Sequence, residues 1–293
     1  MRKIIIGSRG SDLALWQANH VQGQLKSLGY GVEIKIIVTQ GDAIQHLSFD
    51  KMEGKGFFTK EIEKELLEKS IDLAIHSHKD LETNPPKGLV IAAVSERANP
   101  CDALLIRRES VDENARWSLK ENATLGTSSA RRQALVRAFK PDATLKDLRG
   151  NVPTRIQKLR DGQYDAILLA KAGLDRLELD LSEFHVEVLN PEQFVPAPAQ
   201  GVLGLQVREE DSFMKKAISK LNSDDVAQQI NIERKVLNLM DGGCQLPLGV
   251  YCENDDIFVA YAKAKNTPAK NFHFKNDPSA NMAEKIVEAL KLS

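Results

Sequence analysis

The sequence has few cysteines and no motif that would organise them. Its 293 residues include three, Cys101, Cys244 and Cys252, and no two of them are spaced as CxxC. An odd count without that spacing argues against a disulfide framework and against a zinc knuckle. The histidines are scattered except for His76 and His78. No third ligand follows that pair at metal spacing, so we expect no metal site.

Long apolar runs are also missing. No stretch approaches the roughly 18 apolar residues of a membrane span. The N-terminal MRKIIIGSRG has only three consecutive isoleucines, too few for the apolar core of a signal peptide. The net charge of -1 excludes nucleic-acid binding by overall charge. We therefore expect a cytoplasmic protein with neither a membrane nor a nucleic-acid partner.

The hydrophobic pattern alternates between short strands and amphipathic helices. The first hundred residues predict strands at 3–7, 32–38, 73–77 and 89–94 and helices at 11–29 and 58–70. The alternation restarts near residue 103, with strands at 103–108, 144–148 and 165–170 and helices at 128–139, 152–162 and 171–177. This order indicates α/β layers with mostly parallel strands.

The order of elements changes in the last third of the chain. A crossover broken by proline and glycine, residues 194–207, is typical of a hinge. From residue 211 onward the pattern gives two helices, then strands and a last helix at 279–292, which indicates an α+β arrangement. We expect three domains, comprising residues 1–96 with 198–214, residues 97–197, and residues 215–293.

Residues 126–176 carry an excess of positive charge. They contain eleven basic residues and five acidic ones, and several of the arginines, Arg131, Arg132, Arg149 and Arg155, lie at the ends of predicted elements. Cations at a helix N-terminus oppose the helix dipole by roughly 0.3–1 kcal/mol, so stability alone does not explain them. The planar guanidinium fork suits carboxylates and phosphates. A cleft for such anions and a solvated basic face are the two interpretations.

Polar residues also follow strands in the first part of the chain. Arg9 and Ser11 lie between a strand and a helix, where α/β folds bind ligands. Lys79 and Asp80 directly follow the strand at 73–77, so Asp80 leaves its carboxyl end. A single carboxylate there could stabilise a developing cation or carry protons. Taken alone, the motif is better explained by an Asp–Lys surface pair.

Cys244 directly follows Gly242 and Gly243. A buried structural cysteine packs as a small hydrophobe and does not need that setting. Two glycines remove side-chain cover and let the backbone bend sharply. The pattern favours a sulfur presented at the tip of a turn, where a bulky group can reach it.

Eight motifs occur in order between residues 9 and 249. They are R-x-S-x-L-A-L-x-Q, G-K-G-x-F-x-K-E, H-S-x-K-D, G-T-S-S-x-R-R, L-R-G-N-V-x-T-R, A-G-L-x-R-L, P-A-x-x-Q-G and G-G-C-x-x-P-x-G. Together they resemble the porphobilinogen deaminase (hydroxymethylbilane synthase) family, although any one alone would carry little weight.

The resemblance implies two lobes of periplasmic-binding-protein type and a small C-terminal α+β domain that carries the cysteine. It implies a cytosolic transferase of tetrapyrrole (heme) biosynthesis that condenses four porphobilinogen molecules into hydroxymethylbilane with release of ammonia. It also implies a covalent dipyrromethane cofactor, built from two substrate units and joined by a thioether to Cys244. We expect a monomer.

Individual roles follow from the same resemblance. Asp80 would lie beside the pyrrole N–H groups and stabilise an azafulvene-like cation. Acetate and propionate groups would be bound by Arg9, Ser11, Lys79, Arg131, Arg132, Arg149, Arg155 and Arg176. Further hydrogen bonds would come from Ser77, Thr127 and Ser128. Lys51 and Lys55 would lie on a flexible active-site loop, and Gln200 near the cofactor.

Three motifs depart from the pattern expected of the family. Asp12 replaces a common proline, His78 a frequent methionine, and PAPAQG the usual PAVGQG; none removes a charge that the mechanism needs. Two other functions fit part of the pattern. An anion-binding module of two lobes explains the arginines, and a thiol enzyme explains Cys244 but would need a histidine beside it.

Overall fold

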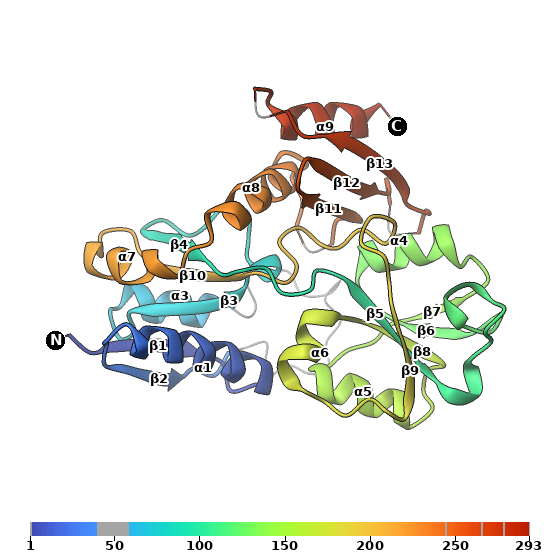
Figure 1. The fold of residues 1–293 in the computed structure, drawn as a ribbon, viewed down its shortest axis with the longest axis horizontal. Coiled ribbons are helices and arrows are strands. Elements are labelled where there is room, and N and C mark those ends of the chain that lie inside the picture. Colours follow the sequence, from blue (N-terminus) through green and yellow to red (C-terminus); the bar gives the residue numbers. More distant parts are fainter. Residues whose placement is uncertain (1, 40–58, 244, 265, 278, 293) are drawn as a thin grey trace. The chain divides into compact units, whose positions relative to one another are not determined.

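The computed structural model describes residues 2–39, 59–243, 245–264, 266–277 and 279–292 (Figure 1). Packing divides the chain into two compact units. Unit 1 comprises Met1–Arg97 and Val202–Ala227, and unit 2 comprises Ala98–Gly201 and Gln228–Ser293. The division into three domains stays a prediction.

Unit 1 is built on a five-stranded mixed sheet. Across the sheet the strands are β2 (Val32–Ile36), β1 (Ile4–Ser8), β3 (Leu73–Ser77), β10 (Leu203–Arg208) and β4 (Leu89–Val94). β1 runs parallel to β2 and β3, whereas β10 is antiparallel to β3 and β4. The longer helices of this unit are α1 (Asp12–Ser27), α3 (Lys60–Leu67) and α7 (Ser212–Ile218).

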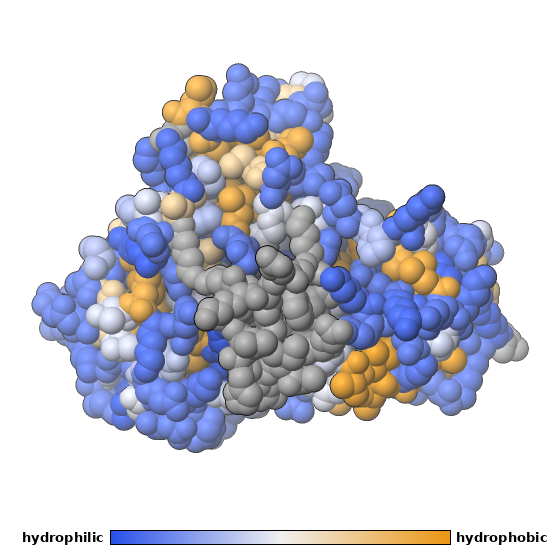
Figure 2. Space-filling model, turned by 180° about the vertical axis from the view of Figure 1, so that it is seen from behind, coloured by the Kyte–Doolittle hydropathy of each residue, from blue (hydrophilic) through white to orange (hydrophobic). Residues whose placement is uncertain are grey.

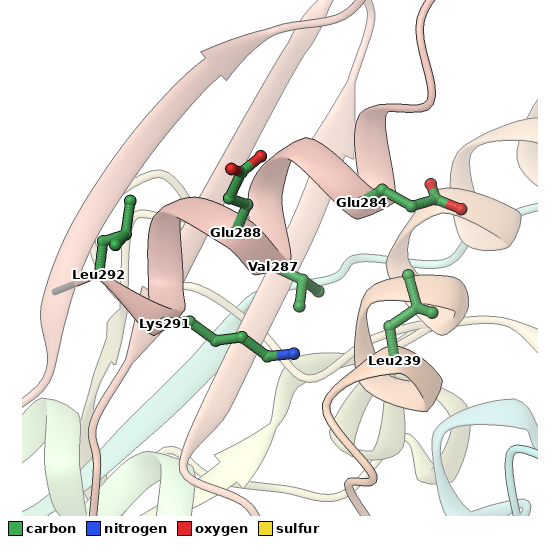
Figure 3. Close-up of a pocket in the computed structure, with 6 residues that line it drawn as sticks. All are labelled: Leu239, Glu284, Val287, Glu288, Lys291 and Leu292. Carbon is green, nitrogen blue, oxygen red and sulfur yellow. The ribbon is translucent and has the colours of Figure 1, made fainter.

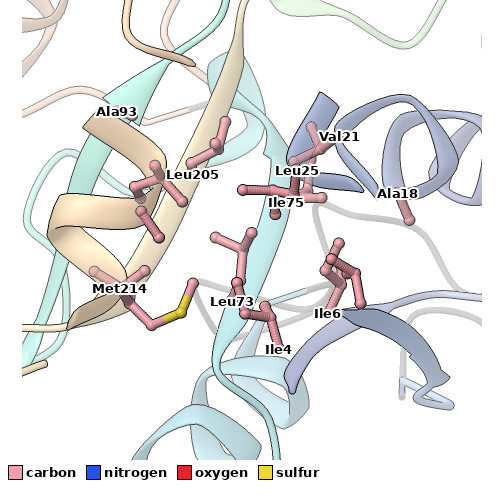
Figure 4. Packing of buried hydrophobic residues seen from close by; sticks show 14 of the residues in the cluster. Ile4, Ile6, Ala18, Val21, Leu25, Leu73, Ile75, Ala93, Leu205 and Met214 are labelled. Carbon is pink, nitrogen blue, oxygen red and sulfur yellow. The ribbon is translucent and has the colours of Figure 1, made fainter. Parts of the chain in front are cut away.

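Strand β3 shows how the sequence forms the two layers of unit 1. Successive strand residues point to opposite faces of a sheet. Leu73 and Ile75 pack in the cluster that includes residues of α1 and α7 (Figure 4), while Ala74 packs on the other face with Ile62 and Leu66 of α3. The apolar run therefore buries both faces, as expected for a strand covered by helices on each side.

Unit 2 contains a second five-stranded sheet with the same arrangement. Its strands, in order, are β7 (Thr144–Lys146), β6 (Thr124–Gly126), β8 (Ala166–Ala170), β5 (Asp102–Arg107) and β9 (Phe184–Val188). As with β10 in unit 1, the fourth strand, β5, is antiparallel to both neighbours. Its helices are α4 (Ala130–Phe139), α5 (Val152–Arg160) and α6 (Lys171–Leu177).

A small antiparallel sheet completes unit 2. It consists of β11 (Leu248–Glu253), β12 (Asp256–Tyr261) and β13 (Lys270–Lys275), accompanied by α8 (Asp224–Leu239) and α9 (Met282–Lys291). Tyr251 and Ala260 pack in the same cluster as Leu135 of α4. The backbone N–H of Ala269 donates to the Ala134 carbonyl over 2.9 Å. The small sheet therefore rests on α4.

The predicted fold class is confirmed, because two mixed α/β sheets and a small three-stranded sheet are present. The predicted crossover 194–207 differs, since it contains most of β10. Gly204 within the strand made the sequence resemble a loop. Gly204 lies close against two side chains, because an added Cβ would lie 3.1 Å from His78 Cδ2 and 3.2 Å from Leu81 Cδ1.

The surface drawn in Figure 2 is mainly hydrophilic, with apolar side chains in small groups. Among the residues that the structure describes, no helix combines the length and apolar character needed to cross a membrane.

A buried chain of polar side chains links β3 to α3. His76 Nε2 lies 3.0 Å from Gln206 Oε1, and Gln206 Nε2 donates to Glu63 Oε1 over 3.0 Å. Because the amide oxygen can only accept, Nε2 of the imidazole carries the proton. Burial lowers the pKa of His76 to about 4, although the bond to Gln206 opposes the shift. The imidazole is therefore neutral at physiological pH.

We expect acid to destabilise the fold through His76. The unfolded chain binds the proton near pH 6.5 and the folded chain only near pH 4, so stability rises with pH across this window. Going from about pH 7.5 to about pH 5 should remove about 2 kcal/mol of unfolding free energy through this group. Urea unfolding of wild type and His76→Gln at both pH values measures the effect. The variant should lose about 2 kcal/mol less than wild type, and equal losses would contradict the assignment.

Candidate functional site

Five of the predicted residues lie at one edge of the unit 1 sheet. They are Arg9, Ser11, Ser77, Lys79 and Asp80. β1 and β3 are parallel neighbours, so the segments that leave their carboxyl ends meet at the same edge. Gln17 of α1 donates through Nε2 to Ser77 Oγ over 2.9 Å, which ties the start of that helix to the end of β3.

Asp80 ends a single 3-10 turn, His78–Asp80, that follows β3 directly. The turn is anchored because the His78 N–H donates to the Val202 carbonyl over 2.9 Å. Lys79 is half-buried and the Asp80 side chain is exposed. A carboxylate is thus presented at this edge from an anchored backbone.

A second group of predicted residues lies at the carboxyl ends of β6 and β7. Ser128 Oγ donates to the Leu148 carbonyl and accepts from its N–H, both over 3.0 Å. Arg149 follows immediately, and Arg155 Nε in the first turn of α5 donates to the Gly150 carbonyl over 2.7 Å. Gly150 has φ of 113°, a conformation that favours glycine. Ser128, Arg149 and Arg155 are therefore brought together.

Thr127 lies beside Ser128 but is buried. Its Oγ1 accepts from the Ser129 N–H over 3.3 Å, and Ser129 caps α4. The Thr127 hydroxyl therefore helps to shape the entry to α4.

Arg131 and Arg132 lie in the first turn of α4, on its buried face. They precede Leu135 and Val136 by four residues each, and side chains four apart share a helix face. The two arginines are 4% and 6% exposed. Both pair with Asp102 at the start of β5, Arg131 Nη1 with Oδ2 over 2.8 Å and Arg132 Nη2 with Oδ1 over 2.7 Å.

Gln200 reaches the same carboxylate. Its Nε2 donates to Asp102 Oδ1 over 3.0 Å and to the Pro100 carbonyl over 2.7 Å. Burial would raise the pKa of Asp102, but the two guanidinium groups outweigh it and hold that pKa well below its ordinary range. Three predicted site residues thus converge on one ionised carboxylate.

Asp102 was missed in the sequence, although a signal for it exists. Residues two apart on a strand share a face, and Leu104 and Ile106 of β5 pack in the cluster that contains α4. Asp102 begins that series, so it faces the helix that carries Arg131 and Arg132. A charged residue at a buried strand position requires a partner of opposite charge.

Arg176, in the last turn of α6, is also buried. Its Nη2 donates to the Gly201 carbonyl over 2.8 Å. Burial lowers the pKa of Arg176 to about 10, so the side chain stays charged at neutral pH. This guanidinium is bound to the residue that follows Gln200.

Cys244, Lys51 and Lys55 lie outside the described residues, but the glycines before the cysteine are described. A Cβ added to Gly242 would lie 2.6 Å from Leu246 Cδ2 and 2.8 Å from Leu237 Cδ1. A Cβ added to Gly243 would meet no atom of the described residues within 4 Å. Packing therefore requires the first glycine, while the second borders open space.

These features fit the dipyrromethane implied by the motifs. Arg131 Nε is buried and has no hydrogen-bond partner in the described part of the chain. An unsatisfied buried donor costs about 1–3 kcal/mol, and a carboxylate oxygen of a bound molecule would satisfy it. Gly243, which precedes Cys244 in the sequence, borders space that no described residue fills. The described residues contain no His, Cys, Asp and Glu cluster suited to a metal ion.

A separate groove of about 380 Å³ lies between the end of α8 and α9 (Figure 3). It is lined by Leu239, Glu284, Val287, Glu288, Lys291 and Leu292, none of which is a predicted site residue. The apolar side chains lie between charged ones and no polar groups converge, so the groove is not the candidate site.

Comparisons with known proteins agree with the motifs. Residues 4–216 match the family described as porphobilinogen deaminase, dipyromethane cofactor binding domain. The chain is 44% identical to porphobilinogen deaminase of Oceanobacillus iheyensis, covering 88% of this chain and 84% of the relative. It is 42% identical to that of Sulfurimonas denitrificans, covering 85% and 79%.

Solved structures align less closely. The periplasmic VFT2 domain of BvgS from Bordetella pertussis aligns with a TM-score of 0.43 and 15% identity, over 79% of this chain and 92% of that domain. The sequence matches are what decide the family. The chain belongs to the porphobilinogen deaminase family.

Proposed function

We propose that this chain condenses four porphobilinogen molecules head to tail into hydroxymethylbilane and releases one ammonia at each step. It is then a transferase of tetrapyrrole biosynthesis that acts in the cytoplasm, as a monomer, on a small-molecule substrate. The match of residues 4–216 to the cofactor-binding domain of porphobilinogen deaminases carries this proposal. The identity of 42–44% to porphobilinogen deaminases over most of the chain supports it.

In this proposal the cationic groups bind the acetate and propionate side chains of the pyrroles. Arg149 and Arg155 stand at the carboxyl ends of strands, where α/β folds bind ligands. Guanidinium groups bind carboxylates through two parallel hydrogen bonds, which fixes orientation as well as position. Arg9, Ser11, Lys79 and Ser77 serve the same purpose at the edge of the unit 1 sheet.

Asp80 is the proposed catalytic carboxylate. Loss of ammonia from porphobilinogen leaves a cation on the pyrrole, and a fixed negative charge stabilises such a cation more than it stabilises the neutral reactant. The anchored 3-10 turn holds Asp80 at the edge while its side chain stays exposed. The same oxygen atoms can accept the proton of a pyrrole N–H.

Cys244 would hold the dipyrromethane through a thioether, and the bound group supplies a primer on which the chain grows. The thiolate is the nucleophilic form of cysteine and forms the bond with an electrophilic methylene. The described residues proposed to lie beside it include Gly242, Gly243, Arg131 and Arg132.

The covalent group predicts a mass difference. Purified protein should exceed its sequence mass by two pyrrole units, and Cys244→Ala should lose that excess because the attachment atom is gone. Cys101→Ala, which removes a half-buried thiol outside the glycine turn, should keep it. Intact-protein mass spectrometry measures all three. A wild-type protein at its bare sequence mass would count against the covalent cofactor.

Asp80→Ala should lower kcat at least about 100-fold, because carboxylate participation in proton transfer contributes this much or more. The KM for porphobilinogen should change less than about threefold if other residues bind the substrate. Glu82→Ala, which removes an exposed carboxylate two residues later, is the matched control and should retain kcat. Near-normal turnover of Asp80→Ala would remove this residue from the catalytic role.

The two glycines before Cys244 should respond differently to substitution. Gly242→Ala should cost about 1–3 kcal/mol of stability, because the new methyl group overlaps Leu237 and Leu246. Gly243→Leu should stay within about 0.5 kcal/mol of wild type, as a side chain in open space does. It should nevertheless slow formation of the pyrrole adduct at least tenfold. Urea unfolding and mass spectrometry distinguish the two effects, and an unhindered adduct on Gly243→Leu would contradict the placement.

A further inference from the structure

We propose that Asp102 is a positioning residue, which fixes Arg131, Arg132 and Gln200 in the arrangement that receives one carboxylate of the pyrrole chain. The inference rests on the proposed function. It assigns a role to Asp102, which lies in none of the eight motifs that indicated that function.

Donors from two separate segments converge on the Asp102 carboxylate. Oδ1 of Asp102 accepts from Arg132 Nε over 3.2 Å, from Arg132 Nη2 over 2.7 Å and from Gln200 Nε2 over 3.0 Å, while Oδ2 pairs with Arg131. These donors come from α4 and from the segment between β9 and β10. One carboxylate therefore sets the positions of the two arginines relative to Gln200, which lies 68 residues after Arg132 in the sequence.

Asp102 is also held rigidly in the sheet. The Asp102 backbone is part of the sheet, because its carbonyl accepts from the Leu189 N–H over 2.9 Å and it lies opposite Ala170 of β8. The side chain is fully buried, so it does not itself meet a ligand. An ordered carboxylate on a strand orients its partners more closely than one on a loop.

The charges of the cluster also favour an anionic ligand. Two guanidinium groups and one carboxylate leave a net charge of +1, which matches a single carboxylate ligand. Without Asp102, two buried like charges would face each other unscreened and repel. Arg131 Nε is among the buried donors that lack a hydrogen-bond acceptor in the described residues. The positive charge that Asp102 leaves uncompensated is what one ligand carboxylate would balance.

The experiment follows the rate at which the full chain acquires its two-pyrrole adduct. Wild type and variants are produced in cells that make no porphobilinogen, mixed with porphobilinogen, and sampled by intact-protein mass spectrometry. Asp102→Asn keeps the shape and removes the charge, and it should slow adduct formation at least tenfold. Wild type that forms no adduct contradicts the proposed function, whereas an Asp102→Asn rate equal to wild type overturns only the role of Asp102.

Asp165→Asn is the matched control. Asp165 also supports the unit 2 sheet, because it accepts from the Thr124 N–H over 2.8 Å and from Ser110 Oγ over 2.7 Å and pairs with Lys120. None of these partners is a predicted site residue. The control should keep the adduct rate within twofold of wild type. A similar slowing in both variants would mean that any loss of a structural carboxylate has this effect, and would overturn the proposal.

Epistasis separates positioning from general damage. If Asp102 acts through the two arginines, then adding Asp102→Asn to the variant Arg131→Gln/Arg132→Gln should change the adduct rate by no more than twofold. A further tenfold slowing overturns the proposal. Should Asp102→Asn fail to fold, as judged by circular dichroism, Asp102→Glu retains the charge and moves it by one methylene. The folded Asp102→Glu chain should then load at least fivefold more slowly, and an unchanged rate overturns the proposal.

Discussion

Both lobes depend on one strand that is inserted antiparallel between two others. β10 lies between β3 and β4, and β5 lies between β8 and β9. Without the inserted strand, the facing N–H and C=O groups of its neighbours would lose their partners inside the protein, which is costly. An antiparallel strand also begins where its neighbours end. Asp102 at the start of β5 lies opposite Ala170 at the end of β8, and Leu203 of β10 lies opposite Ser77 of β3.

The antiparallel direction of β5 brings its first residue to the edge of the unit 2 sheet. Carboxyl ends of parallel strands are the ligand-binding edge of α/β sheets, and the inserted strand adds its own amino-terminal residue there. Asp102 reaches this edge in this way, and Gln200, also in unit 2, bonds to it. The sheet topology therefore supplies a carboxylate and an amide beside the arginines of α4. Removing one partner from such a buried ionic cluster typically costs about 3–5 kcal/mol, because it leaves an uncompensated charge.

Much of the fold could be predicted because its strands and helices have strong periodicity. The helices near residues 11–29 and 128–139 and the strand at 73–77 are all present. Strand β10 was hidden by Gly204, whose role depends on a side chain, His78, more than a hundred residues away. The motifs identified the arginines. They did not show that Arg131 and Arg132 both pair with the buried Asp102. That pairing depends on β5 lying beside α4, and hydrophobic periodicity within either element does not reveal which elements become neighbours.

The arginines of unit 2 differ in what they offer a ligand. Arg155 and Arg176 donate to neutral backbone carbonyls. Arg131 and Arg132 share the charge of Asp102. In the proposed function these arginines bind carboxylates of the dipyrromethane, and the buried members would limit where it can sit. Exposed cations attract a polyanion from any direction, whereas a pair held by a rigid carboxylate accepts it in one orientation, as an ordered chain extension requires.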